Sequence, residues 1–73
     1  MILYTNNTRV NAIVTIKVGQ GGDLIKGLKI GPPGAASAQK VFTGYNDVLV
    51  PAETSIELED GLDVTFTGVR TCP

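Results

Sequence analysis

Histidine is absent from this sequence, and cysteine occurs once, at Cys72. A zinc site needs four ligands of soft or borderline type, so the composition argues against zinc. One cluster of carboxylates is a calcium candidate, but it lacks the spaced Asp/Asn-Gly loop of common calcium sites. It comprises Glu57, Glu59, Asp60 and Asp63. We expect these side chains to form the solvent face of a hairpin, with no metal and no cofactor. The lack of cysteine pairs indicates a reducing compartment.

Catalytic groups are equally scarce. Without histidine, a serine nucleophile depends on a lysine or carboxylate for activation, and Ser37 and Ser55 have none at a suggestive spacing. Paired carboxylates can act as general acid and base, and Glu57 and Glu59 project from the same side of an expected strand, roughly 7 Å apart. A solvated strand face explains this arrangement equally well. The glycine-rich stretch VGQGGD lacks both the dinucleotide and the ATP-binding patterns. We expect no enzymatic activity and no small-molecule substrate.

Charge is sparse and mixed in sign, because six basic and seven acidic residues give a net charge of −1. The basic residues are spread along the chain, and Tyr and Phe together supply the few aromatic residues. The sequence therefore has neither a basic stripe for a phosphate backbone nor stacking platforms for bases, and nucleic acid is not an expected partner.

The first residues, MILYTNN, contain no basic leader and no apolar run of membrane-spanning length. We expect no signal peptide, no membrane association and a soluble, unprocessed product made in the cytoplasm. Asn6, Asn7 and Thr8 form a glycosylation sequon. Without a secretory signal, we interpret this sequon as turn chemistry.

The length of 73 residues and the hydrophobic content of 42% indicate one domain, 1–73, with a single core. A β domain of this size without disulfides or metal is marginally stable by itself. We therefore expect it to gain stability from a partner or from copies of itself.

Apolar and polar residues alternate in the first half of the chain. This alternation predicts a strand with one buried side, formed by Val10, Ala12, Val14, Ile16 and Val18. Glycines at 19–22 then favour a turn. A second strand follows at 24–30, with Leu24, Leu28 and Ile30 on one side. The segment 31–40, GPPGAASAQK, predicts a loop, because consecutive prolines interrupt a sheet ladder; AASAQK is compatible with a single helical turn.

The second half contains the most regular pattern. VFTGY and DVLVPA predict two short strands joined near Gly44 to Asp47. Two further strands follow, and we predict that they form a hairpin with Asp60-Gly61 at its tip. Their inward residues are Thr54, Ile56 and Leu58 before the turn and Leu62, Val64 and Phe66 after it. The expected fold is all-β, a small β-sandwich or jelly-roll-like barrel of six to seven antiparallel strands.

Three stretches, ILYTNNT, IVTIKVG and VLVPAETSIELEDGLDVTFTGV, cover about half of the chain. They resemble short virion proteins of tailed bacteriophages, namely capsid decoration or cement proteins and small domains of head and tail fibres. In these proteins a glycine usually follows VPA, where this chain has Glu53, which makes a tight turn there less favourable.

The resemblance implies a jelly-roll-like sandwich that assembles as a homotrimer and stabilises the head shell without catalysis. The expected partner is then the major capsid protein or another virion protein, and the expected location is the virion. The alternative is a small monomeric binding module, either a phage-encoded inhibitor of a host protein or a carbohydrate-binding fibre domain. Tyr45 beside Asn46 and Asp47 is the candidate sugar cluster, although Tyr45 also suits a core-capping role.

We predict the partner surface on GPPGAASA and the nearby YND, the least periodic stretches and thus the least committed to the core. Two prolines reduce the entropy that a loop loses on docking, and small side chains let it lie flat against another protein. The candidate binding residues are Pro32, Pro33, Ala35, Ser37, Tyr45 and Asn46. A merely exposed connection is the other interpretation of the loop.

Overall fold

The computed structural model describes residues 1–19, 25–32, 34–39, 41–59 and 61–71, with the backbone alone for 25–27. This described part contains seven strands and no helix. The strands are β1 (Ile2–Thr5), β2 (Ala12–Val18), β3 (Ile25–Gly31), β4 (Ser37–Gln39), β5 (Gly44–Val50), β6 (Ser55–Leu58) and β7 (Val64–Thr71). Every pairing between them is antiparallel. The predicted all-β class and strand number are confirmed.

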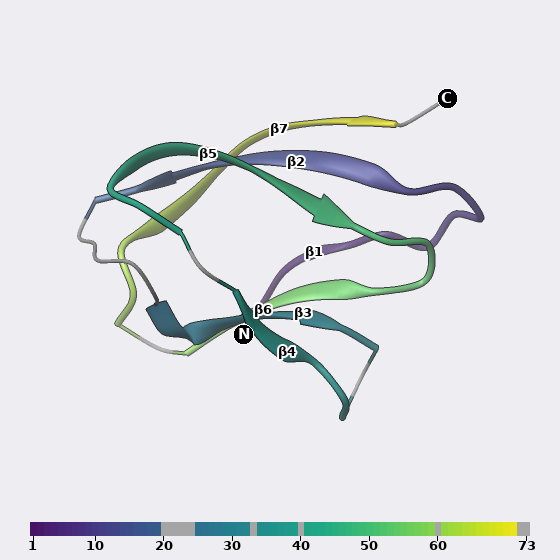
Figure 1. Cartoon of the computed structure of the whole chain (residues 1–73), viewed down its shortest axis with the longest axis horizontal. Coiled ribbons are helices and arrows are strands. Elements are labelled where there is room, and N and C mark those ends of the chain that lie inside the picture. Colours follow the sequence, from purple (N-terminus) through teal and green to yellow (C-terminus); the bar gives the residue numbers. More distant parts are fainter. Residues whose placement is uncertain (20–24, 33, 40, 60, 72–73) are drawn as a thin grey trace.

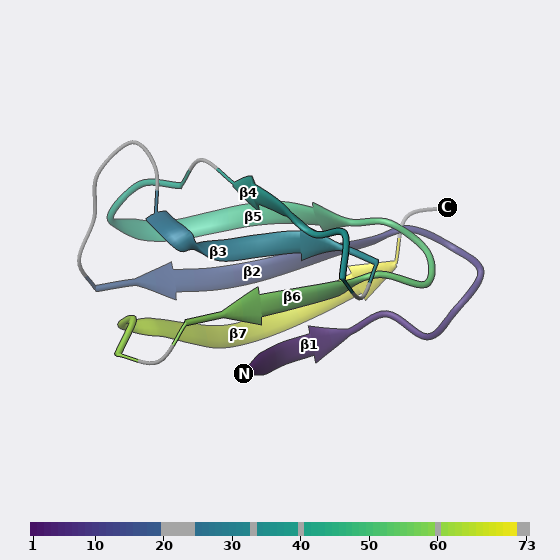
Figure 2. The same ribbon diagram turned by 90° about the horizontal axis from the view of Figure 1, so that it is seen from below.

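The strands form two facing sheets. One sheet has the order β1-β6-β3-β4, and the other has the order β5-β2-β7. Figure 1 shows them as two layers, with β5, β2 and β7 above and the four-stranded sheet below. In Figure 2, which is seen from below, the strands of the four-stranded sheet lie in front. The architecture is a small β-sandwich.

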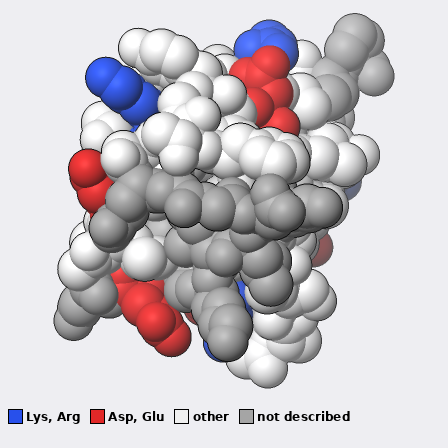
Figure 3. All heavy atoms as spheres, turned by 60° about the vertical axis from the view of Figure 1, so that its left-hand side comes forward, with Lys and Arg blue, Asp and Glu red and all other residues white. Residues whose placement is uncertain are grey.

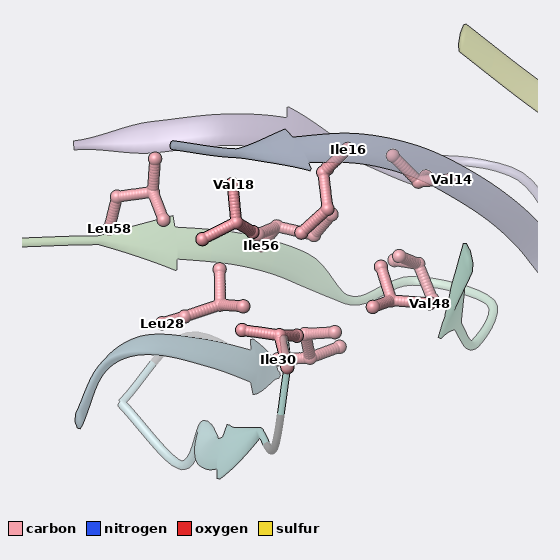
Figure 4. Close-up of a cluster of buried hydrophobic side chains, with 10 residues drawn as sticks. Val14, Ile16, Val18, Leu28, Ile30, Val48, Ile56 and Leu58 are labelled. Atoms are coloured by element: carbon pink, nitrogen blue, oxygen red, sulfur yellow. The ribbon is translucent and has the colours of Figure 1, made fainter. Parts of the chain in front are cut away.

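The core lies between the two layers and is built by the alternation read from the sequence. In β2 the side chains of Val14, Ile16 and Val18 are fully buried, while Lys17 is exposed. Figure 4 shows these residues pointing towards the opposite sheet. Among the residues whose burial the structure describes, the cluster comprises Val14, Ile16, Val18, Leu28, Ile30, Val41, Val48, Val50, Ile56 and Leu58. Val10 was expected to extend this row, but it precedes β2 and is 45% exposed.

The predicted hairpin at Asp60-Gly61 is wrong. β6 pairs with β1 and β3, whereas β7 pairs with β2 in the other sheet, so the chain crosses from one layer to the other between them. Gly61 has the predicted positive φ, at 89°, while Asp60 lies outside the described residues. The inward residues of two strands follow the same alternation whether the strands lie side by side or face each other across a core.

Two other expectations are corrected in the middle of the chain. Ser37–Gln39 forms β4 and pairs with β3, so it is neither loop nor helical turn. The expected break at Gly44 to Asp47 is part of one regular strand, because Tyr45, Asn46 and Asp47 each pair with a residue of β2. Gly44 begins this strand with a φ of 102°, a conformation that glycine adopts at low cost.

The sandwich has two long seams where edge strands of its two sheets meet. In the closed seam, between β1 and β7, the rings of Tyr4 and Phe66 stack with centroids 5.7 Å apart. The sheet orders then place β4 opposite β5, and this is the open seam. Phe66 was predicted to face inward; its position in the closed seam leaves it 38% exposed.

Asn6 organises the end of the sandwich where the chain turns from β5 into β6. Its side chain is buried, and its amide nitrogen donates hydrogen bonds to the carbonyls of Val10 (2.8 Å), Val50 (3.0 Å) and Pro51 (3.2 Å). Its side-chain oxygen accepts hydrogen bonds from the backbone and hydroxyl of Thr8. These contacts agree with the interpretation of the sequon as turn chemistry, since buried polar groups need partners.

The turn after β5 is tight despite its missing glycine. The backbone nitrogen and the hydroxyl of Thr54 both donate to the carbonyl of Pro51, at 3.2 and 2.7 Å. Glu53 occupies the third position with a φ of 62°, a left-handed conformation that favours glycine in such turns. The chain therefore keeps the turn geometry and accepts the backbone strain.

Candidate protein-binding surface

The outer side of the three-stranded sheet is a regular surface that carries large exposed side chains. Its residues alternate with the buried ones of β2 and β5, and register places them in rows across the three strands. We call this surface the flat face. It comprises Ile13, Thr15, Lys17, Tyr45, Asp47, Leu49, Thr65, Gly68 and Arg70.

Large side chains on the flat face point into solvent. Tyr45 is 70% exposed, Leu49 is 50% exposed, and Ile13, opposite Leu49, is half-buried. Tyr45 is therefore not the core-capping tyrosine that its sequence position also suited. Gly68, opposite Thr15 on β7, adds no side chain, so the middle of the face stays low.

A polar cluster joins the three strands at the centre of this face. Asp47 accepts a hydrogen bond from the hydroxyl of Thr15 (2.5 Å) and lies 3.2 Å from a guanidinium nitrogen of Arg70. The Thr15 hydrogen bond and the Arg70 guanidinium lower the pKa of Asp47 below its ordinary value of 3.8. The carboxylate is thus held ionised, although an ion pair this exposed contributes little to stability.

Lys17 lies beside the exposed aromatic ring of the flat face. Its ammonium group is 5.8 Å from the centroid of the Tyr45 ring, a cation–π distance. Lys17, Asp47 and Arg70 give the face charges of both signs. Figure 3 shows a basic and an acidic group in contact at the top of the view and other charged groups scattered among uncharged atoms.

The predicted cluster of Tyr45, Asn46 and Asp47 does not converge on one side. Tyr45 and Asp47 lie on the flat face, whereas Asn46 turns away and closes the preceding turn. Its amide nitrogen donates to the carbonyls of Phe42 (2.7 Å) and Gly44 (3.2 Å), and its side-chain oxygen accepts from the Phe42 nitrogen (3.1 Å). Asn46 therefore holds the backbone of the turn before β5, and this turn carries Phe42, which is 55% exposed.

The other predicted binding residues lie on the hairpin between β3 and β4. Pro32, Ala35 and Ser37 are exposed there, and the Ala35 nitrogen donates to the Pro32 carbonyl at 3.0 Å. Pro33 lies outside the described residues. The hairpin and Tyr45 belong to different sheets, so the structure divides the predicted surface into two parts.

A groove follows the open seam. It has a volume of about 480 Å³ and is bounded on one side by the β3–β4 hairpin and on the other by β5 and the turn after it. Its lining residues are Ile30, Gly31, Pro32, Gln39, Asp47, Val48, Leu49, Pro51 and Thr54. Among the predicted binding residues that the structure describes, Pro32 lines this groove. The sequence carried no signal for the groove, because its walls come from segments that only pair in three dimensions.

Within the described residues, no group of three or more Cys, Asp or Glu side chains is arranged to hold a metal ion. The same part of the chain contains no helix that is long and apolar enough to cross a membrane. Comparisons of this chain with protein-family models, with curated proteins and with solved structures found no match. Any function assigned to this chain therefore rests on its own sequence and geometry.

Proposed function

We propose that this protein is a non-enzymatic structural protein that attaches to another protein through the flat face. The observation that supports this proposal is the uncovered face itself, with Tyr45 70% exposed and Leu49 50% exposed on a rigid sheet. Large apolar groups that stay in water on a rigid surface mark interaction sites, and tyrosine is enriched among the residues that dominate binding energies.

The size of the flat face indicates how it binds. Three strands at about 4.8 Å spacing and about seven residues of 3.4 Å each give roughly 350 Å². A stable protein interface buries about 800 Å² on each partner, so one copy of this face binds weakly. When several copies bind at once, detachment requires all of their contacts to break together, so weak single contacts give firm attachment.

Weak repeated attachment suits a shell of identical subunits. The resemblance to bacteriophage decoration proteins supports a capsid as that shell, with the major capsid protein or another virion protein as the partner. A homotrimer would present three flat faces to the lattice at once, which raises effective affinity without any change in the single contact.

A sugar-binding module is the alternative that the sequence allows, and the geometry favours it less. Sugar sites combine an aromatic platform with convergent polar groups. Here the amide of Asn46 is engaged by backbone carbonyls of the preceding turn and points away from Tyr45, so the polar groups of the predicted cluster do not converge beside the ring. The Lys17 ammonium group lies 5.8 Å from the centroid of the Tyr45 ring.

Site-specific photo-crosslinking tests this proposal. A benzophenone amino acid replaces Tyr45 in one variant and Lys29, exposed on the outer side of β3, in a control. Each variant is produced in cells that assemble the virion, and crosslinks are mapped by mass spectrometry. We expect one defined adduct with a shell subunit from position 45 and none from position 29. Equal crosslinking from both positions, or none from position 45, would contradict docking through the flat face.

A further inference from the structure

The described part of the sandwich has four edge strands, and they differ in how well they could pair with an added strand. β1 and β4 have four and three residues, and short edges are poor templates for pairing. β7 has eight residues, but its register with β2 shifts between Thr15 and Ile16, an irregularity that protects an edge. β5 keeps register with β2 at all seven positions, and in the described part of the chain no strand pairs with its other side.

The groove of the open seam runs beside this regular edge. Asp47, Val48 and Leu49 of β5 form one wall, and Pro32 and Gln39 of the hairpin form the other. The volume of about 480 Å³ lies within the range of pockets that hold ligands.

The groove ends in a rigid corner. The carbonyl of Pro51 accepts hydrogen bonds from Thr54 and from the buried amide of Asn6, which also binds Val50. The opposite wall is held by the hydrogen bond from Ala35 to Pro32. Both walls are therefore positioned before any ligand arrives, which lowers the entropy cost of binding.

We propose that the free edge of β5 accepts an extended peptide segment of a partner protein, which adds as a strand and places side chains in the open-seam groove. Backbone N–H and C=O groups of an edge strand supply the hydrogen bonds, and the groove selects alternate side chains of the peptide. This site goes beyond the proposed function, because it uses the edge of the sheet and a different class of contact.

Charge identifies the peptide. Asp47 borders the groove, its carboxylate binds Thr15 and Arg70 on the flat face, and its side chain is 54% exposed. A carboxylate accepts about four hydrogen bonds, so Asp47 has capacity for a lysine or arginine of the peptide. The segment that fits is extended and carries a basic residue opposite Asp47, on the flat-face side of the added strand.

The same charge argues against a second copy of this chain at the edge. Asp47 is the middle residue of Gly44–Val50. Antiparallel pairing of β5 with another β5 over its full length would place the two Asp47 carboxylates directly opposite each other. Like charges in that position destabilise a strand pair.

A random library of seven-residue peptides is the probe. It is selected against the wild-type protein, and enriched peptides are synthesised with and without N-methylation of alternate backbone amides. We expect the enriched peptides to carry a lysine or arginine and to bind at least tenfold more weakly when N-methylated. A selection against the Asp47→Asn variant should not favour lysine or arginine. Failure to enrich any peptide, or equal binding after N-methylation, overturns the proposal.

Matched variants locate the site. Gln39→Trp fills the groove and is expected to weaken binding at least tenfold, whereas Gln39→Ala opens it and should bind as the wild type does. Tyr45→Ala on the flat face should also keep peptide binding, which separates this site from the proposed attachment surface. If Gln39→Trp does not fold, the peptide is added to the wild-type protein and the changes in its amide chemical shifts are mapped. Changes confined to 31–39 and 44–54 support the site. Changes centred on Lys17 and Thr65 contradict it.

Discussion

The two seams of the sandwich are held by different kinds of interaction. The closed seam is held by side-chain packing, since the rings of Tyr4 and Phe66 stack and Leu3, Leu62 and Val64 pack against the core beside them. The open seam is held at its end by hydrogen bonds from Asn6 and Thr54 to backbone carbonyls. One side of the molecule is thus filled by side chains, and the other keeps a groove.

The composition of the edge strands explains this difference. β1 and β7 each contribute one of the few aromatic residues, whereas β4 contributes Ser37, Ala38 and Gln39. These three side chains are small or polar, so they do not cover the edge of β5. The other two aromatic residues, Phe42 and Tyr45, are 55% and 70% exposed. Two aromatic rings therefore close one seam, and a third, Tyr45, lies on the flat face, where binding is proposed.

The largest expected effect is at the corner of the open seam. Asn6→Ala leaves the buried carbonyl of Val50 and its neighbours without their donor, so it should lower the free energy of unfolding by about 3 kcal/mol. Urea denaturation of the purified variant measures this. Asn7→Ala, at an exposed neighbouring position, should change stability little. Equal loss in both variants would show that the hydrogen bonds of Asn6 do not hold the corner.

Packing in the closed seam should contribute somewhat less. Phe66→Ala removes the stacked ring facing Tyr4 and should cost about 2 kcal/mol, because the ring is partly exposed and a stacked pair is worth about 1 kcal/mol beyond its burial. Phe42→Ala removes the same ring from an exposed position and is the control. Thermal unfolding should give a lower melting temperature for Phe66→Ala than for Phe42→Ala. Identical melting temperatures would show that the ring stack in the closed seam does not contribute to stability.

Glu53→Gly should stabilise the turn that borders the open seam. A left-handed conformation costs a non-glycine residue about 1–2 kcal/mol, and the added freedom of glycine in the unfolded chain offsets part of that gain. The net expected increase is about 0.5 kcal/mol in urea denaturation. Glu53→Ala keeps the backbone cost and removes the carboxylate, so a gain in both variants would assign the effect to charge.

The smallest effect concerns Asp47 and pH. Its pKa in the folded protein is lowered by Thr15 and Arg70, so its contribution to stability is present above the ordinary pKa of 3.8 and is lost as pH falls through the lower folded value. We expect the difference in melting temperature between the wild type and Asp47→Asn to shrink as the pH falls below about 4. A difference that stays constant across that window would show that the ionised carboxylate is not involved.

The sequence predicted the strands whose apolar residues alternate over enough positions. β2 and β6 were found with their buried faces correct, because Val14, Ile16, Ile56 and Leu58 follow a period of two. β4 was missed, because three polar or small residues carry no such period. Tyr45 and Asp47 belong to the predicted stretch YND, but the remainder of the flat face was not predicted, because Lys17 and Arg70 lie far from that stretch in the sequence and meet it only through strand pairing.

By itself, the amino-acid sequence determined the all-β class and which side of each regular strand faces the core. It did so because burial of alternate side chains depends on local spacing alone. Which strands pair was decided by the tertiary structure: β6 and β7 are neighbours in the chain but belong to opposite sheets. A hairpin and a crossing between layers bury the same residues, so only the packing of the whole sandwich distinguishes them. The closed seam, the groove and the free edge of β5 are consequences of that packing.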